Sequence, residues 1–471
     1  MRPPRSTSAT TSAIRKIRSL PSCRGSPAGS GQRFPRADVR PLSGKWYVLL
    51  LLTSVYALNI ADRFVMSTLI EPIKAELHLS DSSVAFLTGI ALAIFYVSAG
   101  LPLATLADRV NRRNLIAAAL LAWSAMTSLC ALAQNYWQLL LCRLGVGVGE
   151  AGGTPPSNSI ISDYFPWQDR AFALSVFSLG ASLGSMLGST AGYISDAWGW
   201  RRAYLVLGLP GVLLALILWA TVREPQRGRL DLLQKSLPVA GLLATLRFAS
   251  RQPALIHVWA GATVFTLWAW GLMWWTPSYL VRSHHMTLGA AGGALSLMHG
   301  VGGTLVLLST GAIMTRLAPR DPRALPRFTA IVIAAATLPA IVAYVSRSSN
   351  VTLGMLWLFI PLSYAAFGPT YALIQNLVPA SMRAQSSALL MLFANLANLV
   401  VAPQLVGFAS DALAPRYGPE SLRIALIPLA LTGFWAAAHY WLAARGLDSA
   451  LLRAGNEYRP SERSPTVSAA Y

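Results

Sequence analysis

The chain has 471 residues, of which 54% are hydrophobic and 12% are charged. Soluble domains carry about 25% charged residues, so this composition excludes a soluble globular protein, and the high apolar content excludes a disordered chain. The 38 lysine and arginine residues exceed the 18 acidic ones and give a net charge of +20. The class that remains is a polytopic membrane protein.

The beginning of the chain differs in composition from the rest. Residues 1–44 are rich in Arg, Ser and Pro and hold no apolar stretch, so they are not a secretory signal. We predict a disordered basic cytoplasmic tail, while an organellar transit peptide stays open. Cys23, Cys130 and Cys142 lack metal-binding spacing, so we expect no metal, no cofactor and no disulfide framework.

From Trp46 onward, apolar runs of about 20 residues recur, each long enough to cross about 30 Å of hydrocarbon as a helix. A basic linker at 223–252 divides them into two six-helix bundles, 45–222 and 253–446, followed by a tail at 447–471. The predicted fold is therefore all-α, with twelve transmembrane spans at 46–69, 82–106, 114–134, 137–162, 171–194, 203–222, 254–281, 289–315, 328–346, 351–378, 384–410 and 423–444.

Basic residues are distributed unevenly among the predicted loops. If the N-terminus is cytoplasmic, most of the 38 lysine and arginine residues fall in cytoplasmic segments and few fall in the outer loops. Because positive charge concentrates on the cytoplasmic side, we predict that both termini are cytoplasmic, in a multi-pass protein of the cell (inner) membrane. The charge then needs no nucleic acid, and anionic membrane lipids are the simpler partner.

Short motifs repeat between the two halves. Pro166 precedes Arg170 by four residues at the start of the fifth span, and Pro379 precedes Arg383 in the same way at the start of the eleventh. The two spans also end alike, at 192–196 and 407–411, each with a Ser-Asp pair. This correspondence indicates duplicated halves, a transporter plan in which the binding site lies between them.

The loop after the second span resembles the signature of the major facilitator superfamily, which implies a membrane transporter. The resemblance covers residues 45–445. Asp108, Arg109, Arg112 and Arg113 fit the signature, although Ala104 and Asn111 replace its glycines. The resemblance implies that these four charged residues form a cytoplasmic gating latch; ordinary positive-inside charge is the alternative for the arginines.

Within this superfamily, residues 59–63 and 143–151 are similar to the Spinster-type lipid transporters. The similarity implies an amphipathic substrate such as a lysolipid. A small organic anion, attracted by Arg63 and Arg143, is the alternative substrate.

Four ionisable residues lie deep inside predicted spans, namely Asp62, Arg63, Arg143 and Glu150. A charge at the bilayer centre costs about 2.5–3.5 kcal/mol on insertion scales, so each should face protein or water. Helical rise places Asp62 and Arg143 at similar heights, which predicts an ion pair between spans 1 and 4. Asp62 and Glu150 are our candidates for proton coupling; a static network joining the two spans is the alternative.

Other polar residues lie at depths suited to a central cavity. In the alternative interpretation they form ordinary hydrogen bonds between helices. The candidate substrate-binding residues are Arg63, Arg143, Tyr56, Asn59, Tyr371, Gln375 and Asn395.

Glycine, proline and tryptophan patterns leave further alternatives open. Gly180, Gly184, Gly188 and Gly192 form either a static packing seam or a sliding interface between the halves. The glycines and Pro155-Pro156 of span 4 indicate either a bending, cavity-lining helix or simple packing. The tryptophans at 268–275 suggest an aromatic belt at the outer boundary, or else an apolar substrate path.

Together these features predict a secondary transporter that works by alternating access, is coupled to protons and acts as a monomer. We expect its small-molecule substrate to be lipid-like and amphipathic, or a small organic anion. The alternatives are a polytopic enzyme such as a glycosyltransferase, and an organic-anion or drug efflux carrier of the same superfamily. The outer loops are too short for the enzyme, so we expect none. No nucleotide-binding loop is present.

Overall fold

The computed structural model describes residues 44–91, 93, 103, 106, 109–226 and 241–454. Within these residues all regular structure is helical. The predicted tail at 1–44 (except Gly44), most of the predicted span 82–106, Asp108 and the end of the C-terminal tail lie outside the described residues.

The described part of the first half is a series of helices. Asn111 and Asn135 cap the helices that follow them through side-chain hydrogen bonds to backbone N–H groups, the role that Asn commonly has at helix starts. The helices are α1 (Lys45–Thr68), α2 (Ile70–Leu77), α3 (Asp81–Thr88), α5 (Arg112–Leu129), α6 (Tyr136–Glu150), α7 (Thr154–Tyr164), α8 (Trp167–Ser189), α9 (Ala191–Trp198) and α10 (Trp200–Thr221).

The second half repeats this pattern. Two of its apolar helices contain π-helical segments, at Met298–Gly303 and Leu396–Val401. Its helices are α11 (Leu242–Ser250), α12 (Pro253–His284), α13 (Leu288–Leu297), α14 (Thr304–Leu317), α15 (Ala324–Val345), α16 (Ser349–Ser363), α17 (Phe367–Leu377), α18 (Arg383–Asn395), α19 (Ala402–Tyr417), α20 (Ser421–Arg445) and α21 (Leu447–Arg453).

Nine helical runs within the described part of the chain are long and apolar enough to span a membrane. One of them, Gln385–Arg445, covers two of the predicted spans. The predicted span 137–162 is built from α6 and α7, which are separate helices. Since 82–106 is mostly not described, the number twelve and the domain bounds 45–222 and 253–446 stay predictions.

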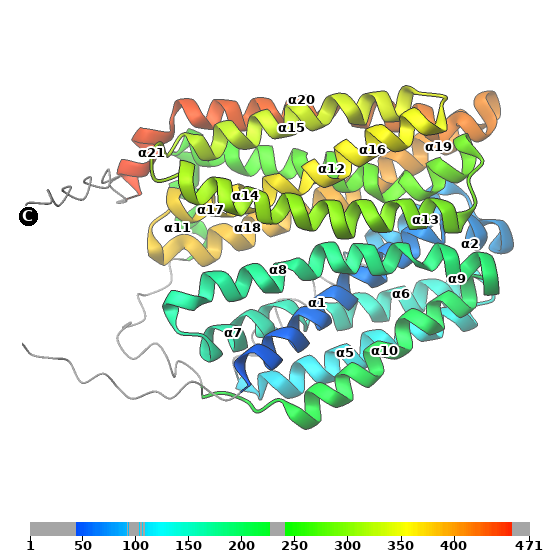
Figure 1. Ribbon diagram of the computed structural model, residues 1–471, viewed down its shortest axis with the longest axis horizontal. Helices are drawn as coiled ribbons and strands as arrows, with labels where there is room; N and C mark the ends of the chain where they lie inside the picture. Colours follow the sequence, from blue (N-terminus) through cyan, green and yellow to red (C-terminus); the bar gives the residue numbers. More distant parts are fainter. Residues whose placement is uncertain are drawn as a thin grey trace, which may run out of the picture. The chain divides into compact units, whose positions relative to one another are not determined.

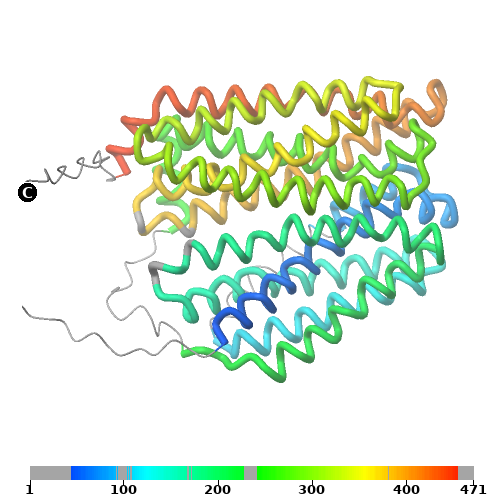
Figure 2. Tube along the Cα trace, viewed as in Figure 1, coloured from blue at the N-terminus to red at the C-terminus, as the bar shows by residue number. Residues whose placement is uncertain are grey.

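The long helices run side by side between two ends, which Figures 1 and 2 show at the right and left. We call the end with α2 and the turn before α13 the Asp81 end, and the end with α7, α11 and α21 the Arg112 end. Helix α1 packs on α8, α5 on α10, and α20 on both α12 and α15.

Two hydrophobic cores hold these helices together. The larger contains residues of both halves, including Ile70 and Leu139 of the first and Leu272 and Leu280 of the second. The smaller is built almost wholly from the first half, around Trp123. The larger core is therefore shared by the two halves.

Candidate functional site

A buried ion pair joins α1 to α6. Arg63 donates from Nε and Nη2 to Glu150 Oε2, at 3.0 and 2.8 Å. The Glu150 side chain is fully buried, and its second oxygen, Oε1, has no hydrogen-bond partner among the described residues. One carboxylate oxygen therefore accepts both bonds from Arg63.

Arg143 lies in the same helix as Glu150 but is not paired. It is completely buried, and its Nε, Nη1 and Nη2 atoms all lack a hydrogen-bond partner among the residues that the structure describes. Buried arginines normally have partners, because an unsatisfied charged donor is costly. Arg143 is thus a fixed buried cation with free hydrogen-bonding capacity.

The predicted ion pair between Asp62 and Arg143 is wrong for this conformation. Within the described residues no ion pair within 4.0 Å joins the two side chains, although Asp62 is 4% exposed and the charges of Glu150, Arg143 and Arg63 all act on it. Helical rise gives the height of a residue along its own axis. It does not give the rotation that decides which side chains meet.

Glycines bring α6 close to α5 and so bury these charges. A Cβ atom at Gly149 would lie 2.7 Å from Trp123 Cβ, and one at Gly145 would lie 2.7 Å from Met126 Cγ. After Glu150 the chain turns at 151–153 before α7 begins, with proline in its first turn. The interruption that Pro155-Pro156 predicts is present; its movement during transport stays a prediction.

A polar contact at Tyr364 links the halves. His299 Nδ1 lies 3.0 Å from the Tyr364 hydroxyl, which donates to Ser185 Oγ at 3.4 Å. Phe64 packs edge-on against the His299 ring. No sequence pattern pointed to Tyr364 or Ser185. His299 lies in a π-helical segment, a distortion that is frequent at functional sites but that sequence periodicity does not reveal.

The other predicted substrate-binding residues have different surroundings. Tyr56 stacks on Phe177, with ring centroids 4.8 Å apart. Asn59 is buried, and its Nδ2 has no hydrogen-bond partner in the part of the chain that the structure describes. Both precede Arg63 on α1, at spacings that place the three on one helix face.

The remaining candidates lie in the second half. Tyr371 is 42% exposed, Gln375 donates to Ser387 Oγ at 3.1 Å, and Asn395 is half-buried at the end of α18. Their role in binding stays a prediction.

The predicted latch residues include a buried arginine. Arg112 donates to Asp163 at 2.6 Å and to Glu224 at 2.7 Å, which ties α5 to α7 and to the segment after α10. Arg113 donates to the carbonyls of Trp219 and Val222. Arg109 is exposed, and Asp108 lies outside the described residues.

Asp163 and Glu224 were missed because they stand outside the loop motif. Within the described residues, the contacts of Arg112 and Arg113 lie in the first half and in the segment directly after α10, so they brace that half. A gating role for the cluster stays a prediction.

The repeated motifs make matching contacts. Arg170 Nε donates to the Ser162 carbonyl at 3.0 Å, and Arg383 Nε donates to the Gln375 carbonyl at 2.9 Å. Each acceptor lies eight residues before its arginine. The predicted correspondence between these motifs therefore extends to their geometry.

Ion pairs join the halves at the Asp81 end. Arg282 donates to both oxygens of Asp81, at 2.6 and 2.7 Å, and to Glu71 at 2.8 Å. Ser410 also donates to Asp81, at 2.7 Å. Burial acts to raise the pKa of Asp81, but hydrogen bonds and charge from Arg282 and further bonds from Lys74 and Ser410 hold it well below its usual range.

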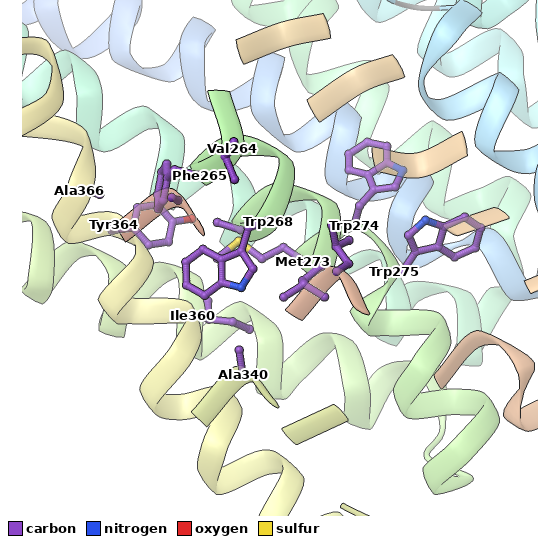
Figure 3. Close-up of a cluster of buried hydrophobic side chains, with 14 of the residues drawn as sticks. Val264, Phe265, Trp268, Met273, Trp274, Trp275, Ala340, Ile360, Tyr364 and Ala366 are labelled. Atoms are coloured by element: carbon purple, nitrogen blue, oxygen red, sulfur yellow. The ribbon is translucent and has the colours of Figure 1, made fainter. Parts of the chain in front are cut away.

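Three tryptophans of α12 are core residues. Trp268, Trp274 and Trp275 are at most 4% exposed, and Figure 3 shows them among other buried apolar side chains. Trp268 Nε1 donates to the Ala430 carbonyl. The predicted aromatic belt is therefore wrong for these three residues. An apolar side chain can be surrounded either by protein or by lipid, and the sequence does not distinguish the two.

The glycine stripe of α8 is mainly a seam inside one half. Cβ atoms at Gly180, Gly184 and Gly188 would lie 2.9, 2.3 and 2.5 Å from carbonyl oxygens of α1. Only Gly192 faces the second half, where its Cβ would lie 2.2 Å from the Leu288 carbonyl oxygen. The packing interpretation holds for the first three glycines.

The sequence and the fold of this chain are similar to those of known membrane transporters. A family model described as the Major Facilitator Superfamily matches residues 52–402. An MFS-type efflux pump of Mycolicibacterium smegmatis is 34% identical over 412 residues, covering 84% of this chain and 92% of the pump. The sphingosine-1-phosphate transporter SPNS2 of Danio rerio is 28% identical over 439 residues, covering 86% and 83%.

A solved structure has the same fold. The crystal structure of a bacterial homolog to the human lysosomal transporter Spinster, inward-facing and unoccupied, aligns with a TM-score of 0.76 at 29% identity, over 88% of this chain and 98% of that one. The resemblance drawn from the sequence is confirmed. The chain belongs to the Major Facilitator Superfamily and is a Spinster-like membrane transporter.

Proposed function

We propose that this protein is a proton-coupled secondary transporter that moves an anionic amphipathic solute by alternating access. Its twelve spans form two six-helix halves in the cell (inner) membrane, and the Arg112 end lies on the cytoplasmic side. The single observation that carries the proposal is the buried group of four charges at Asp62, Arg63, Arg143 and Glu150, which hydrocarbon would not tolerate without a functional reason.

In this mechanism Glu150 carries the proton. A proton arriving at the unpartnered Oε1 neutralises the carboxylate, and Arg63 then loses the charge that holds it. Loss of the proton restores the pair. Asp62, which is buried beside these charges, is the second proton-accepting group. A static Arg63–Glu150 pair is the rival interpretation, and it needs no change in protonation.

Arg143 supplies the anion-binding group. Its three unpartnered nitrogen atoms match a phosphate or carboxylate, which guanidinium groups bind through paired hydrogen bonds. The zebrafish relative is named for sphingosine-1-phosphate, an amphipath with a phosphate head group. Arg63, Tyr56, Asn59, Tyr371, Gln375 and Asn395 contribute further contacts.

An organic-anion or drug efflux carrier is the second candidate. The mycobacterial relative is named an efflux pump, and the same unpaired Arg143 would receive a small anion. The two candidates share the mechanism and differ in the apolar part of the solute. We propose that the chain works as a monomer in either case.

Proteoliposomes test the coupling. We expect Glu150→Gln to abolish accumulation of a labelled anionic lysophospholipid driven by a pH gradient while counterflow exchange persists, because exchange needs no net proton movement. Glu420→Gln, at a half-buried site of the Asp81 end where the carboxylate pairs with Arg423, is the matched control and should retain both activities. Intact gradient-driven accumulation in Glu150→Gln would overturn the proton role.

The same vesicles separate the candidate substrates. Inhibition of uptake by anionic lysophospholipids but not by small organic anions supports the lipid-like solute, and the reverse supports the efflux carrier. We expect Arg143→Gln to lose transport of either anion. Transport unaffected by this substitution would contradict anion docking at Arg143.

A further inference from the structure

A pocket at the Arg112 end lies far along the chain from the charges discussed above. Its volume is about 370 Å³, and it is lined by Arg323, Arg327, Trp441, Ala444 and Arg445. Arg323 immediately precedes α15, Arg327 lies in its first turn, and the other three residues belong to the last turns of α20. The basic recess therefore lies between the ends of two helices that pack on each other.

The recess keeps an excess of positive charge. Arg323 pairs with Asp448, and Arg327 reaches Asp321 at 3.3 Å. Arg445 is exposed and forms no ion pair with the described residues around it. The side chains of Arg323 and Arg327 are 39% and 45% exposed, so their remaining N–H groups can reach a further anion.

The pocket continues into an apolar surface. Trp441 is 47% exposed beside it, and Phe434 and Trp435, farther along α20, are 41% and 55% exposed. On α15, Ile331 and Leu338 are 58% and 59% exposed. In a membrane protein such side chains face acyl chains, and a tryptophan near the helix end is typical of the head-group level.

We propose that this pocket binds the phosphodiester head group of an anionic phospholipid, with its acyl chains along the exposed faces of α15 and α20. Three guanidinium groups suit a phosphate because their N–H forks match its oxygens. Basic pockets between helices at the membrane surface hold anionic head groups in this manner. A free phosphate would use the same arginines but would gain nothing from the apolar surface.

Native mass spectrometry of the purified full-length protein tests this directly. The probes are phosphatidylglycerol and, as the neutral comparison, phosphatidylcholine. Arg327→Gln combined with Arg445→Gln should weaken phosphatidylglycerol binding about tenfold, since each basic residue contributes substantially to anionic-lipid attraction. Arg347→Gln combined with Arg416→Gln removes two exposed charges at the Asp81 end and should change binding less than about twofold.

A charge-preserving variant guards against a folding defect. Arg327→Lys combined with Arg445→Lys should keep most of the affinity, which a general loss of structure would not. Unchanged phosphatidylglycerol binding in the glutamine variant, or equal binding of phosphatidylcholine by the parent, would overturn the proposal. Displacement of the bound lipid by millimolar inorganic phosphate would also overturn it, in favour of a soluble anion.

Discussion

Asp196 and Asp411 make equivalent contacts in opposite directions across the two halves. Asp196, at the end of the fifth span, accepts the backbone N–H of Gly289 at 2.7 Å in α13. Asp411, at the end of the eleventh, accepts the N–H groups of Asp81 and Ser82, both at 2.9 Å, in α3. Each carboxylate thus caps a helix of the other half, where the partial positive charge of a helix start favours an anion.

We expect these caps to hold the Asp81 end closed. Asp411→Ala should favour the conformation in which this end opens, because losing a cap costs about 1 kcal/mol, or about fivefold in population. Spin labels at Gln134→Cys and Asn350→Cys, in a chain with its native cysteines replaced, report the distance between the halves at this end. Longer distances should become more populated.

The control for this measurement is a carboxylate at the opposite end. Asp448→Ala removes the exposed pair with Arg323 and should leave the distance distribution unchanged. If Asp411→Ala behaves like this control, the caps contribute nothing to closure.

The sequence predicted the class of fold and the repeat for identifiable physical reasons. Apolar runs report helix length directly, and the Pro-to-Arg motifs recur because each arginine binds a carbonyl eight residues earlier. The four interior charges stood out because such residues are costly in hydrocarbon. These features depend on local chain geometry or on composition alone.

The contacts between helices could not be predicted in the same way. Arg63, and not Arg143, meets Glu150, because helix rotation and tilt arise from packing at positions such as Gly145 and Gly149. The partners of Arg112 lie 51 and 112 residues away in the chain. No spacing rule connects residues so distant.

The close packing of α8 on α1 predicts a sharp size limit at Gly184. Gly184→Ala would place a Cβ atom 2.3 Å from the Ala57 carbonyl oxygen, so the helices must separate. We expect a loss of about 1–3 kcal/mol in the free energy of unfolding. Gly354→Ala, in α16, meets nothing within 4 Å and should be neutral or stabilising. Equal melting temperatures for the two variants in thermal unfolding would contradict the close packing of α8 on α1.

Closure of the Asp81 end should resist mild acid. Since the pKa of Asp81 is held well below its usual value of about 3.9, its ionic contacts are present above that value and are lost only as the pH falls through the lowered pKa. The spin-label distances should therefore stay constant from pH 8 to pH 5. Asp81→Asn should lengthen them at pH 7, whereas Asp321→Asn at the other end should not. Lengthening near pH 5 with Asp81 intact would contradict this assignment.

Arg143 gives a prediction in which stability and function change in opposite directions. An unsatisfied buried donor costs about 1–3 kcal/mol, and more when charged, so Arg143→Gln should raise the melting temperature of the solute-free protein. The same variant should lose the further stabilisation that an anionic lysophospholipid gives the parent, because ligand binding stabilises only a protein that binds it. Arg416→Gln, at an exposed site, should change neither value. A lower melting temperature in solute-free Arg143→Gln would show that the guanidinium is already satisfied by its surroundings, Asp62 foremost, and anion docking would lose its physical basis.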